Sequence, residues 1–217
     1  MKHAPLNRKR KTKDPCPECG LHKNLCICEL IPSLTFATKV CLIIHKKELK
    51  RTTNTGRLAI KSLTNSEIRI RGGEDRQVLD LSDLLVPTYR TFLFYPSDDA
   101  VELDRDLVEQ SPLPIQLIVP DGNWRQASKV YTRHTELKDV PKVKISTTNS
   151  SIQHLRAEHS AEGMATLQAI AQALQVIEGP QAVEPLMKLY EAKLRNTLIG
   201  RGQIQASAGS IPSEKAR

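Results

Sequence analysis

Short apolar runs alternate with amphipathic patterns along most of this chain. The run at residues 115–119 ends at a proline and a glycine, and apolar residues then recur at helical spacing from Trp124 to Tyr131. Four comparable runs lie at residues 39–45, 67–70, 91–95 and 141–145. Continuous apolar runs of this length are typical of strands buried on both faces, so the alternation predicts an α/β fold with a mostly parallel sheet.

Helical periodicity predicts the elements between these runs. The predicted helices cover residues 52–63, 97–108, 124–131, 164–178 and 184–198. We expect residues 97–99 to cap the second of them, and Gly179 and Pro180 to separate the last two. Residues 46–51 are predicted to form a polar loop, and residues 77–81 either a short strand or a connection.

The chain has 217 residues, enough for one domain with a small appendage. Residues 1–14 are rich in lysine and arginine, and we expect a disordered basic arm there. Residues 200–217 are predicted to form a flexible tail. Between these arms we expect a metal-binding knuckle at residues 15–32 and the main domain at residues 33–199.

The net charge of +8 favours a polyanionic partner, and nucleic acid before a membrane surface, over a protein that is merely basic. No apolar run approaches the roughly 18 residues of a membrane span, and no apolar segment follows the basic arm, so we expect a cytoplasmic protein. The row formed by Arg125, Lys129 and Arg133 is either a solvated helix face or a contact for RNA phosphates.

Four of the five cysteines lie close together, as Cys16-Pro-Glu-Cys19 and Cys26-Ile-Cys28. Four thiolates at this spacing fit a closed, tetrahedral structural zinc site. We expect zinc in preference to disulfides or unliganded thiols, while an iron–sulfur cluster uses the same ligands. Cys41 lies inside an apolar run and is expected to pack in the core.

Asp121 follows the central run at residues 115–119. Ligands of open α/β sheets bind beyond the carboxyl ends of the strands, so Asp121 stands where a ligand is expected. The alternative is a helix N-cap with Trp124 packed behind it, and packing is the favoured role of Trp124 over stacking on a base. Residues 53–57 offer hydroxyls and backbone N–H groups either to an anion or to capping. Neither a Gly-x-Gly-x-x-Gly motif nor a P-loop is present.

In their order along the chain, these motifs resemble the DTW-domain family, tRNA-uridine aminocarboxypropyltransferases within the broader SPOUT-like group. The resemblance rests on the four cysteines, Thr53-Asn-Thr-Gly-Arg57, Phe94-Tyr-Pro96, Asp121-Gly-Asn-Trp124, Arg156 and Thr166. The chain departs from the family pattern at Asn123, where the family has threonine, and at Gln168, where it has glutamate.

The resemblance implies S-adenosylmethionine as cofactor and transfer of its 3-amino-3-carboxypropyl group to N3 of a uridine in tRNA. It also implies a SPOUT-like sheet with a C-terminal knotted region that cradles the cofactor. Asp121 and Trp124 would then be catalytic. The cofactor site would be lined by Thr53, Asn54, Thr55, Gly56, Arg57, Tyr95, Pro96, Val119, Gly122, Asn123, Arg156 and Thr166. No protein partner is predicted.

Within this hypothesis Asp121 is either the base that removes the N3 proton of uridine or an anchor for the amino group of the cofactor. Two rival functions stay open. One is a SPOUT methyltransferase, which uses the same cofactor but transfers its methyl group. The other is a non-enzymatic RNA-binding protein with a zinc knuckle.

Overall fold

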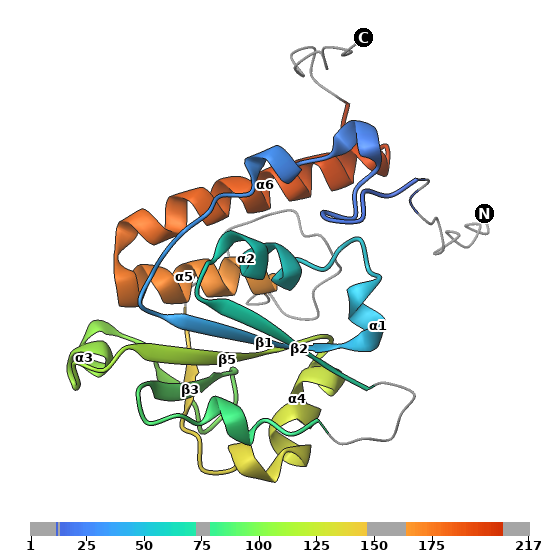
Figure 1. Cartoon of the computed structure of the whole chain (residues 1–217). Helices are drawn as coiled ribbons and strands as arrows, with labels where there is room; N and C mark the ends of the chain where they lie inside the picture. The colour runs from blue at the N-terminus through green and yellow to red at the C-terminus, as the bar shows by residue number, and fades with distance from the viewer. Residues whose placement is uncertain (1–11, 13, 73–78, 147–163, 206–217) are drawn as a thin grey trace, which may run out of the picture.

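The computed structural model describes residues 12, 14–72, 79–146 and 164–205, and most of the two predicted arms lies outside this part of the chain (Figure 1). Six strands form one sheet in the order β2-β1-β5-β3-β6-β4. The strands are β1 (Lys39–His45), β2 (Ser66–Arg71), β3 (Arg90–Phe94), β4 (Val101–Glu102), β5 (Ile115–Asp121) and β6 (Lys142–Lys144). Every pair of neighbours is parallel, which confirms the predicted α/β class.

The helices follow the strands in the predicted alternation. They are α1 (Lys46–Leu49), α2 (Gly56–Ser62), α3 (Arg105–Glu109), α4 (Trp124–Arg133), α5 (Thr166–Glu178) and α6 (Val183–Gly200). Short 3-10 turns lie at Lys23–Leu25, Cys28–Leu30, Ser82–Leu84, Thr135–Leu137 and Pro180–Ala182. Gly179 separates α5 from the turn that leads into α6, as expected.

Two local predictions are wrong. The predicted polar loop at residues 46–51 contains the one-turn helix α1, because Nδ1 of His45 accepts a hydrogen bond from the backbone N–H of Lys47 and caps it. The predicted helix at residues 97–108 begins only at Arg105, where Asp104 is the N-cap. The residues before it form β4, which pairs with β6. Residues 79–81 are not a strand, and the rest of 77–81 lies outside the described residues.

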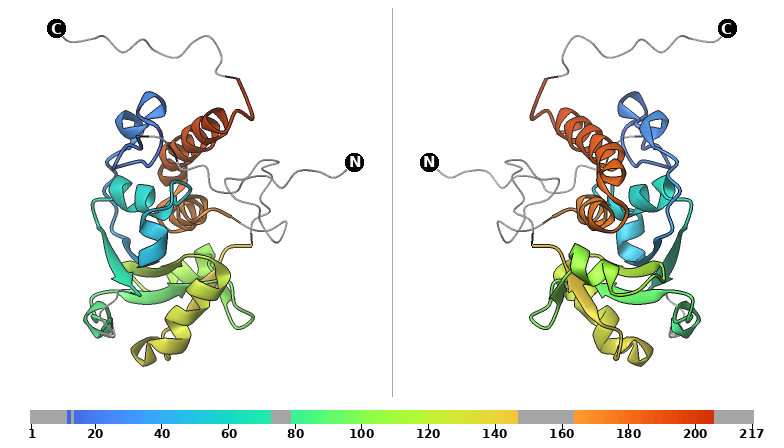
Figure 2. Two further views of the ribbon diagram at one scale, coloured as in Figure 1. Left: turned by 90° about the vertical axis from the view of Figure 1, so that its right-hand side faces the viewer. Right: turned by 90° about the vertical axis from the view of Figure 1, so that its left-hand side faces the viewer.

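Helices cover both faces of the sheet (Figure 2). On one face α2 and α5 pack against it, with α6 lying outside α5, and α4 covers the other face (Figure 1). The strands supply apolar residues to both sides, because alternate side chains point to opposite faces. Leu42 and Val119 pack on the side of α2 and α5, whereas Ile43 and Ile118 pack with Val130 of α4.

Three strands end together at one edge of the sheet. Ile44 of β1 lies opposite Asp121 of β5, and His45 lies opposite Arg71 of β2. The register therefore brings the carboxyl ends of β1, β2 and β5 side by side, as the rule for ligand sites in α/β sheets requires. The predicted knot is expected in the C-terminal region, where residues 147–163 lie outside the described part of the chain, so the knot stays a prediction.

The cysteine-rich segment packs against α6 at the outer layer (Figure 1). Asn196 donates a 3.0 Å hydrogen bond from Nδ2 to the carbonyl of Leu25, and Lys193 donates one from Nζ to the carbonyl of Cys19. The segment is thus held by the last helix although most of the chain separates the two. In the described residues, no helix combines the length and the hydropathy needed to cross a bilayer.

Candidate functional site

Asp121 ends β5 and joins three elements through its carboxylate. Asn54, just before α2, donates from Nδ2 to Oδ2 of Asp121 at 2.5 Å. Thr166, the first residue of α5, donates from Oγ1 to Oδ1 at 2.6 Å. The Asp121 residue is only 5% exposed, so both bonds lie in a water-poor environment. Both of its oxygens act as acceptors, which is the role of an ionised carboxylate.

Residues 54–56, at the start of α2, pack closely against this carboxylate. Oδ1 of Asn54 accepts a 3.2 Å bond from the backbone N–H of Arg57, so the same side chain caps the first turn of α2 and holds Asp121. Oγ1 of Thr55 accepts a 3.2 Å bond from the N–H of Leu167, which ties α2 to α5. A Cβ at Gly56 would lie 3.2 Å from Cγ of Asp121, so glycine permits this approach.

Asn123, not Asp121, caps α4, and the capping interpretation of Asp121 is wrong. Oδ1 of Asn123 accepts from the N–H of Gln126, and Oε1 of Gln126 accepts from the N–H of Asn123, each at 2.9 Å. This is a complete capping box. Gly122 turns the chain between the two residues at a φ of 153°, where a Cβ would lie 2.8 Å from Oε1 of Gln126. Asn123 therefore preserves the start of the helix despite its departure from the family pattern.

Trp124 lies at the rim of this edge rather than in the core. It is 49% exposed, and its ring meets that of Tyr95 edge-on at 6.0 Å between centroids. Tyr95 is itself buried and lies 5.1 Å from the ring of Tyr131. The interpretation of Trp124 as a packing residue is therefore wrong, since half of its surface is open to a partner. Pro96, which follows Tyr95, is exposed.

Other predicted site residues have different neighbours. The guanidinium of Arg57 donates to the carbonyls of Leu49, at 3.0 Å, and Pro17, at 3.3 Å, and so reaches toward the cysteine segment. The side chain of Val119 is buried in the core. Thr53 is half-buried beside Asn54, and Arg156 lies outside the described residues. The structure thus brings together Asn54, Thr55, Gly56, Asp121 and Thr166 from the predicted set.

Gln168, the second departure from the family pattern, has a structural role. It is buried, and its Oε1 accepts a 3.2 Å hydrogen bond from the N–H of Ala165. Ala165 is the N-cap of α5 and has no side-chain oxygen. Gln168 therefore satisfies a backbone donor at the start of the helix that carries Thr166.

The four clustered cysteines can hold one metal ion. Their sulfur atoms all lie within 4.8 Å of one another. Sγ of Cys16 lies 3.6 Å from those of Cys26 and Cys28, and Sγ of Cys19 lies 3.8 Å from that of Cys26. Zn–S bonds of about 2.3 Å in a tetrahedron place sulfurs about 3.8 Å apart. A disulfide needs about 2.05 Å, and these cysteines are free.

The thiols of this cluster differ in how readily they ionise. Backbone N–H groups, that of Cys19 above all, lower the pKa of Cys16 to about 6. Burial raises the pKa of Cys26 and of Cys28. Lys193 of α6 is fully buried behind the cluster, and burial lowers its pKa to about 8. Sequence reasoning missed Lys193, because a lysine at helical spacing is usually solvated.

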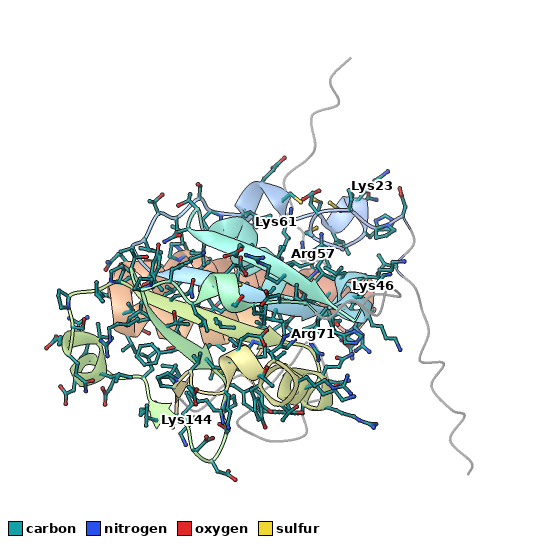
Figure 3. All side chains as sticks on the ribbon, turned by 60° about the horizontal axis from the view of Figure 1, so that its bottom comes forward. Lys23, Lys46, Arg57, Lys61, Arg71 and Lys144 are labelled. Carbon is teal, nitrogen blue, oxygen red and sulfur yellow. The ribbon has the colours of Figure 1, made fainter. Side chains whose placement is uncertain are left out.

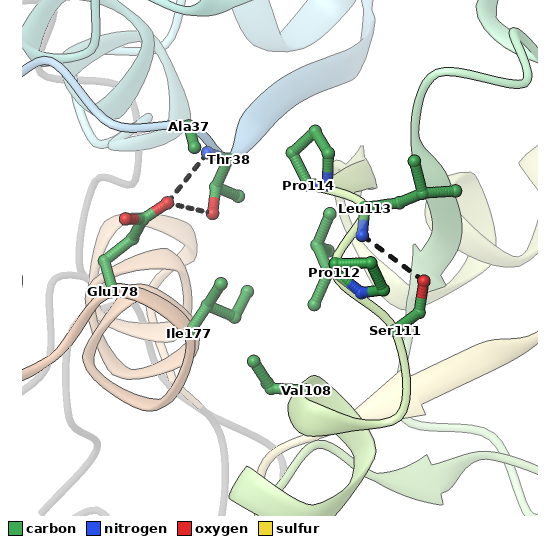
Figure 4. A pocket seen from close by; sticks show the side chains of 10 residues that line it. Ala37, Thr38, Val108, Ser111, Pro112, Leu113, Pro114, Ile177 and Glu178 are labelled. Atoms are coloured by element: carbon green, nitrogen blue, oxygen red, sulfur yellow. Dashed lines mark hydrogen bonds between the residues drawn. The ribbon is translucent and has the colours of Figure 1, made fainter.

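The hollow at the opposite edge of the sheet carries no comparable chemistry (Figure 4). It has a volume of about 190 Å³ and lies between the start of β1, the loop before β5 and the end of α5. Its main polar feature is Glu178, whose Oε1 accepts from the N–H of Thr38 at 2.8 Å and from its hydroxyl. These bonds join α5 to the approach to β1, so we regard this hollow as structural.

Comparison with known proteins places both sites in one family. The DTW domain matches residues 13–198, a range that includes the cysteine cluster and the edge at Asp121. The chain belongs to the DTW-domain family.

Curated relatives of this DTW-domain chain carry closely related names. It is 24% identical over 204 residues to tRNA-uridine aminocarboxypropyltransferase 2 of Macaca fascicularis, covering 91% of this chain and 68% of the relative. It is 29% identical over 203 residues to the Drosophila melanogaster protein of that name, covering 88% and 78%. Against tRNA-uridine aminocarboxypropyltransferase A of Arabidopsis thaliana the identity is 24%, covering 83% and 79%. No solved structure gives a significant match.

The DTW-domain edge thus combines an oriented carboxylate with an exposed aromatic ring. Asp121 can accept a proton or pair with a cation, and Trp124 can stack on a planar base. The cysteine cluster stands apart, bound to α6 and to Arg57. The first turn of α2 lies between the two sites, because Arg57 donates to the carbonyl of Pro17 and the neighbouring Gly56 packs against Asp121.

Proposed function

We propose that this chain transfers the 3-amino-3-carboxypropyl group of S-adenosylmethionine to N3 of a uridine in tRNA. Relatives named tRNA-uridine aminocarboxypropyltransferase match more than four-fifths of the chain, which supports the proposal. The observation that carries the proposal is the buried carboxylate of Asp121, which Asn54 and Thr166 hold at the carboxyl edge of a parallel sheet. This is where α/β proteins bind small ligands.

The groups at this edge fit the chemistry of the cofactor. S-adenosylmethionine carries a sulfonium, which makes its adjacent carbons electrophilic. The cofactor also carries an amine and a carboxylate, and the edge supplies the carboxylate of Asp121 and the hydroxyl of Thr166. Thr53, Arg57, Tyr95, Pro96, Val119 and Arg156 remain predicted members of the cofactor site.

Asp121 is the proposed base for the reaction. N3 of uridine carries a proton at neutral pH. In the transfer, N3 would form a bond to the carbon of the aminocarboxypropyl group next to sulfur, the bond from that carbon to the sulfonium would break, and the rest of the cofactor would leave as a neutral thioether. The N3 proton would pass to a carboxylate within hydrogen-bond reach. The bond from Asn54 goes to one oxygen of the carboxylate and the bond from Thr166 goes to the other. The same two bonds fix the orientation of the carboxylate, which favours attack in one geometry. Asp121 as an anchor for the cofactor amine is the rival role.

Trp124 is the proposed platform for the uracil ring. Base–aromatic stacking contributes about 1–3 kcal/mol per base, and the exposed half of Trp124 lies three residues beyond Asp121. A uracil held on this ring would be close to the end of β5. Trp124 would then act by positioning the base rather than by moving a proton.

Zinc is the proposed ion of the cysteine cluster. The sulfur spacings agree with a tetrahedral ZnS₄ site, and four protein ligands leave no open coordination position. The ion would therefore be structural and would fix the knuckle on α6. Reduced thiols are typical of a reducing compartment, in keeping with the expected cytoplasmic location.

Nucleoside mass spectrometry tests the proposed function. Unmodified tRNA transcripts are incubated with the protein and S-adenosylmethionine, digested to nucleosides and compared with a reaction lacking cofactor. We expect a uridine derivative heavier by one aminocarboxypropyl group. A methylated uridine would instead identify the SPOUT methyltransferase. Unchanged nucleosides, with no heat of cofactor binding in calorimetry, would leave the RNA-binding knuckle protein as the better description.

A further inference from the structure

Four cations form what we call the α4 basic patch: Arg71 from the end of β2, and Arg125, Lys129 and Arg133 from α4. The α4 residues recur every four positions, so they form a row about 12 Å long on one side of the helix. Arg71 joins the row from the sheet, because its guanidinium donates to the carbonyl of Gln126 in α4. Figure 3 shows Arg71 on the side of the molecule that faces the viewer, below Lys46 in that view.

The patch is electrostatically unfavourable in the isolated protein. Arg133, followed by burial, Arg125 and Arg71, lowers the pKa of Lys129. Burial, followed by Arg133, lowers the pKa of Arg71. Among the described residues, none of the four cations of the patch has a carboxylate partner within ion-pair distance. Repulsion of this kind is relieved when a polyanion binds.

Some other cations near the surface form ion pairs with carboxylates. Lys39 pairs with Glu67 and Lys142 pairs with Asp99, each at 2.7 Å. The α4 basic patch differs from these pairs because it gathers four cations for which no described carboxylate is an ion-pair partner. A merely solvated helix face would be expected to carry charges of both signs.

Arg71 shows that the patch is built into the fold. Its residue is only 8% exposed, and within the described part of the chain its Nε has no hydrogen-bond partner. A buried guanidinium nitrogen without a partner costs free energy. The positive charge of the patch also acts on the neighbouring His45. Burial lowers the pKa of His45 first, and Arg71, Lys47 and Lys129 lower it further.

We propose that the α4 basic patch binds the phosphate backbone of the tRNA substrate, an inference that rests on the proposed function. Phosphates match the charge of the row, and arginine is suited to phosphate oxygens. The patch is also correctly placed, because α4 begins three residues after Asp121 and Arg71 lies opposite His45 at the same edge of the sheet. RNA held on the patch would pass Trp124 before it reaches Asp121.

Salt-dependent tRNA binding tests this inference. Fluorescence anisotropy gives the Kd of labelled tRNA at several salt concentrations from low to moderate. The proteins compared are the wild type, the double variant Lys129→Ala/Arg133→Ala and the control double variant Arg105→Ala/Lys188→Ala. The control removes the same charge from residues that are 61% and 72% exposed on other helices. Loss of two phosphate contacts should reduce the slope of log Kd against log salt by about 1.4–1.8, and weaken binding about 25- to 60-fold at roughly 0.1 M salt.

The control should keep the wild-type slope, and both variants should keep the calorimetric affinity for S-adenosylmethionine. An unchanged slope in Lys129→Ala/Arg133→Ala would overturn the patch, even if that variant still transfers the aminocarboxypropyl group. Wild-type protein that prefers vesicles with anionic lipids over tRNA would also overturn it. If wild type transfers nothing but shows the expected change of slope, the proposed function fails and the patch stands as an RNA-binding surface.

Discussion

Thr166 donates a 2.6 Å hydrogen bond to Asp121 across 45 residues of sequence. The bond joins the first residue of α5 to the last residue of β5, and Asn54 holds the other oxygen of the same carboxylate from the start of α2. Three elements that meet at the carboxyl edge of the sheet thus fix one acid. The predictions below follow from this arrangement and from the charges and sulfur atoms around it.

Replacement of Thr166 by valine should reduce catalysis more than stability. Valine keeps the shape of the side chain but removes the donor to Asp121, so the carboxylate loses part of its orientation. We expect kcat to fall about 10- to 100-fold, and the free energy of unfolding to fall by about 1–3 kcal/mol. Thr166→Ser keeps the hydroxyl and should restore most of kcat. Equal loss in the valine and serine variants would show that the hydroxyl does not position Asp121.

Replacement of Gly56 by alanine should destabilise the fold. The new Cβ would lie 3.0 Å from Cδ2 of Leu42 and 3.2 Å from Cγ of Asp121, so the core or the carboxylate must move. We expect a loss of about 1–3 kcal/mol in the free energy of unfolding, measured in urea. Gly200→Ala is the matched control, because its Cβ would meet Leu25 at an ordinary 3.4 Å. A Gly56→Ala variant as stable as that control would contradict the close approach.

The cysteine cluster should bind one zinc ion per chain and stabilise the protein through it. Cys19→Ser removes one ligand and should abolish stoichiometric zinc, measured by elemental analysis, and lower Tm. Cys41→Ala is the control: this thiol is buried in β1, where burial raises its pKa to about 12, and its replacement should leave the zinc content unchanged. Full zinc content in Cys19→Ser would refute a four-cysteine site.

His45 should make the stability of the protein depend on pH. Burial, and then Arg71, Lys47 and Lys129, lowers the pKa of His45, against a smaller opposing effect of Glu48. Between that lowered pKa and the ordinary value of about 6.5, the unfolded chain binds a proton that the folded chain does not. The stability that the neutral His45 side chain gives to the folded protein is therefore fully present above about pH 6.5. It declines as the pH falls through this window, because protonation favours the unfolded chain.

His45→Asn separates this titration from the other groups that respond to acid. Asparagine retains a side-chain acceptor for the cap of α1, where Nδ1 of His45 accepts from Lys47, but it does not titrate. Urea unfolding at about pH 7.5 and about pH 5 should show a smaller loss of stability in the variant than in wild type. A loss of the same size in both proteins would remove His45 as a source of the dependence.

The order of strands and helices along the chain could be predicted from the sequence, because apolar runs and helical periodicity are local patterns. The runs that became β1 and β5 are buried on both faces, so apolar residues alone mark them. The start of α3 was misplaced because Val101–Glu102 joins β6 through a pairing that no local pattern encodes. In the same way, the spacing of Lys193 on α6 suggests solvent exposure, whereas tertiary packing buries it behind Cys19.

The candidate site was predicted as a set of residues but not as a geometry. The ordered motifs named Asn54, Asp121 and Thr166 together, yet the bond between Asn54 and Asp121 spans 67 residues and depends on the register of the sheet. Trp124 was expected to pack, because helical spacing does not reveal whether a large ring reaches the core. Arg71 gave no signal in sequence, since a cation at the end of a strand is common on protein surfaces.

The most direct test of the account is transfer of label by Asp121→Asn. The cofactor carries the label in its aminocarboxypropyl arm, and label on unmodified tRNA is counted in a single turnover, with Asp99→Asn as an isosteric control at a carboxylate that is 66% exposed. Circular dichroism verifies that both variants fold. We predict wild-type transfer in the control and a loss of at least about 100-fold in Asp121→Asn. If Asp121→Asn keeps the wild-type affinity for the cofactor, Asp121 is the base; if that affinity collapses, Asp121 is the anchor for the cofactor amine. Wild-type transfer by a folded Asp121→Asn variant would contradict the proposed site.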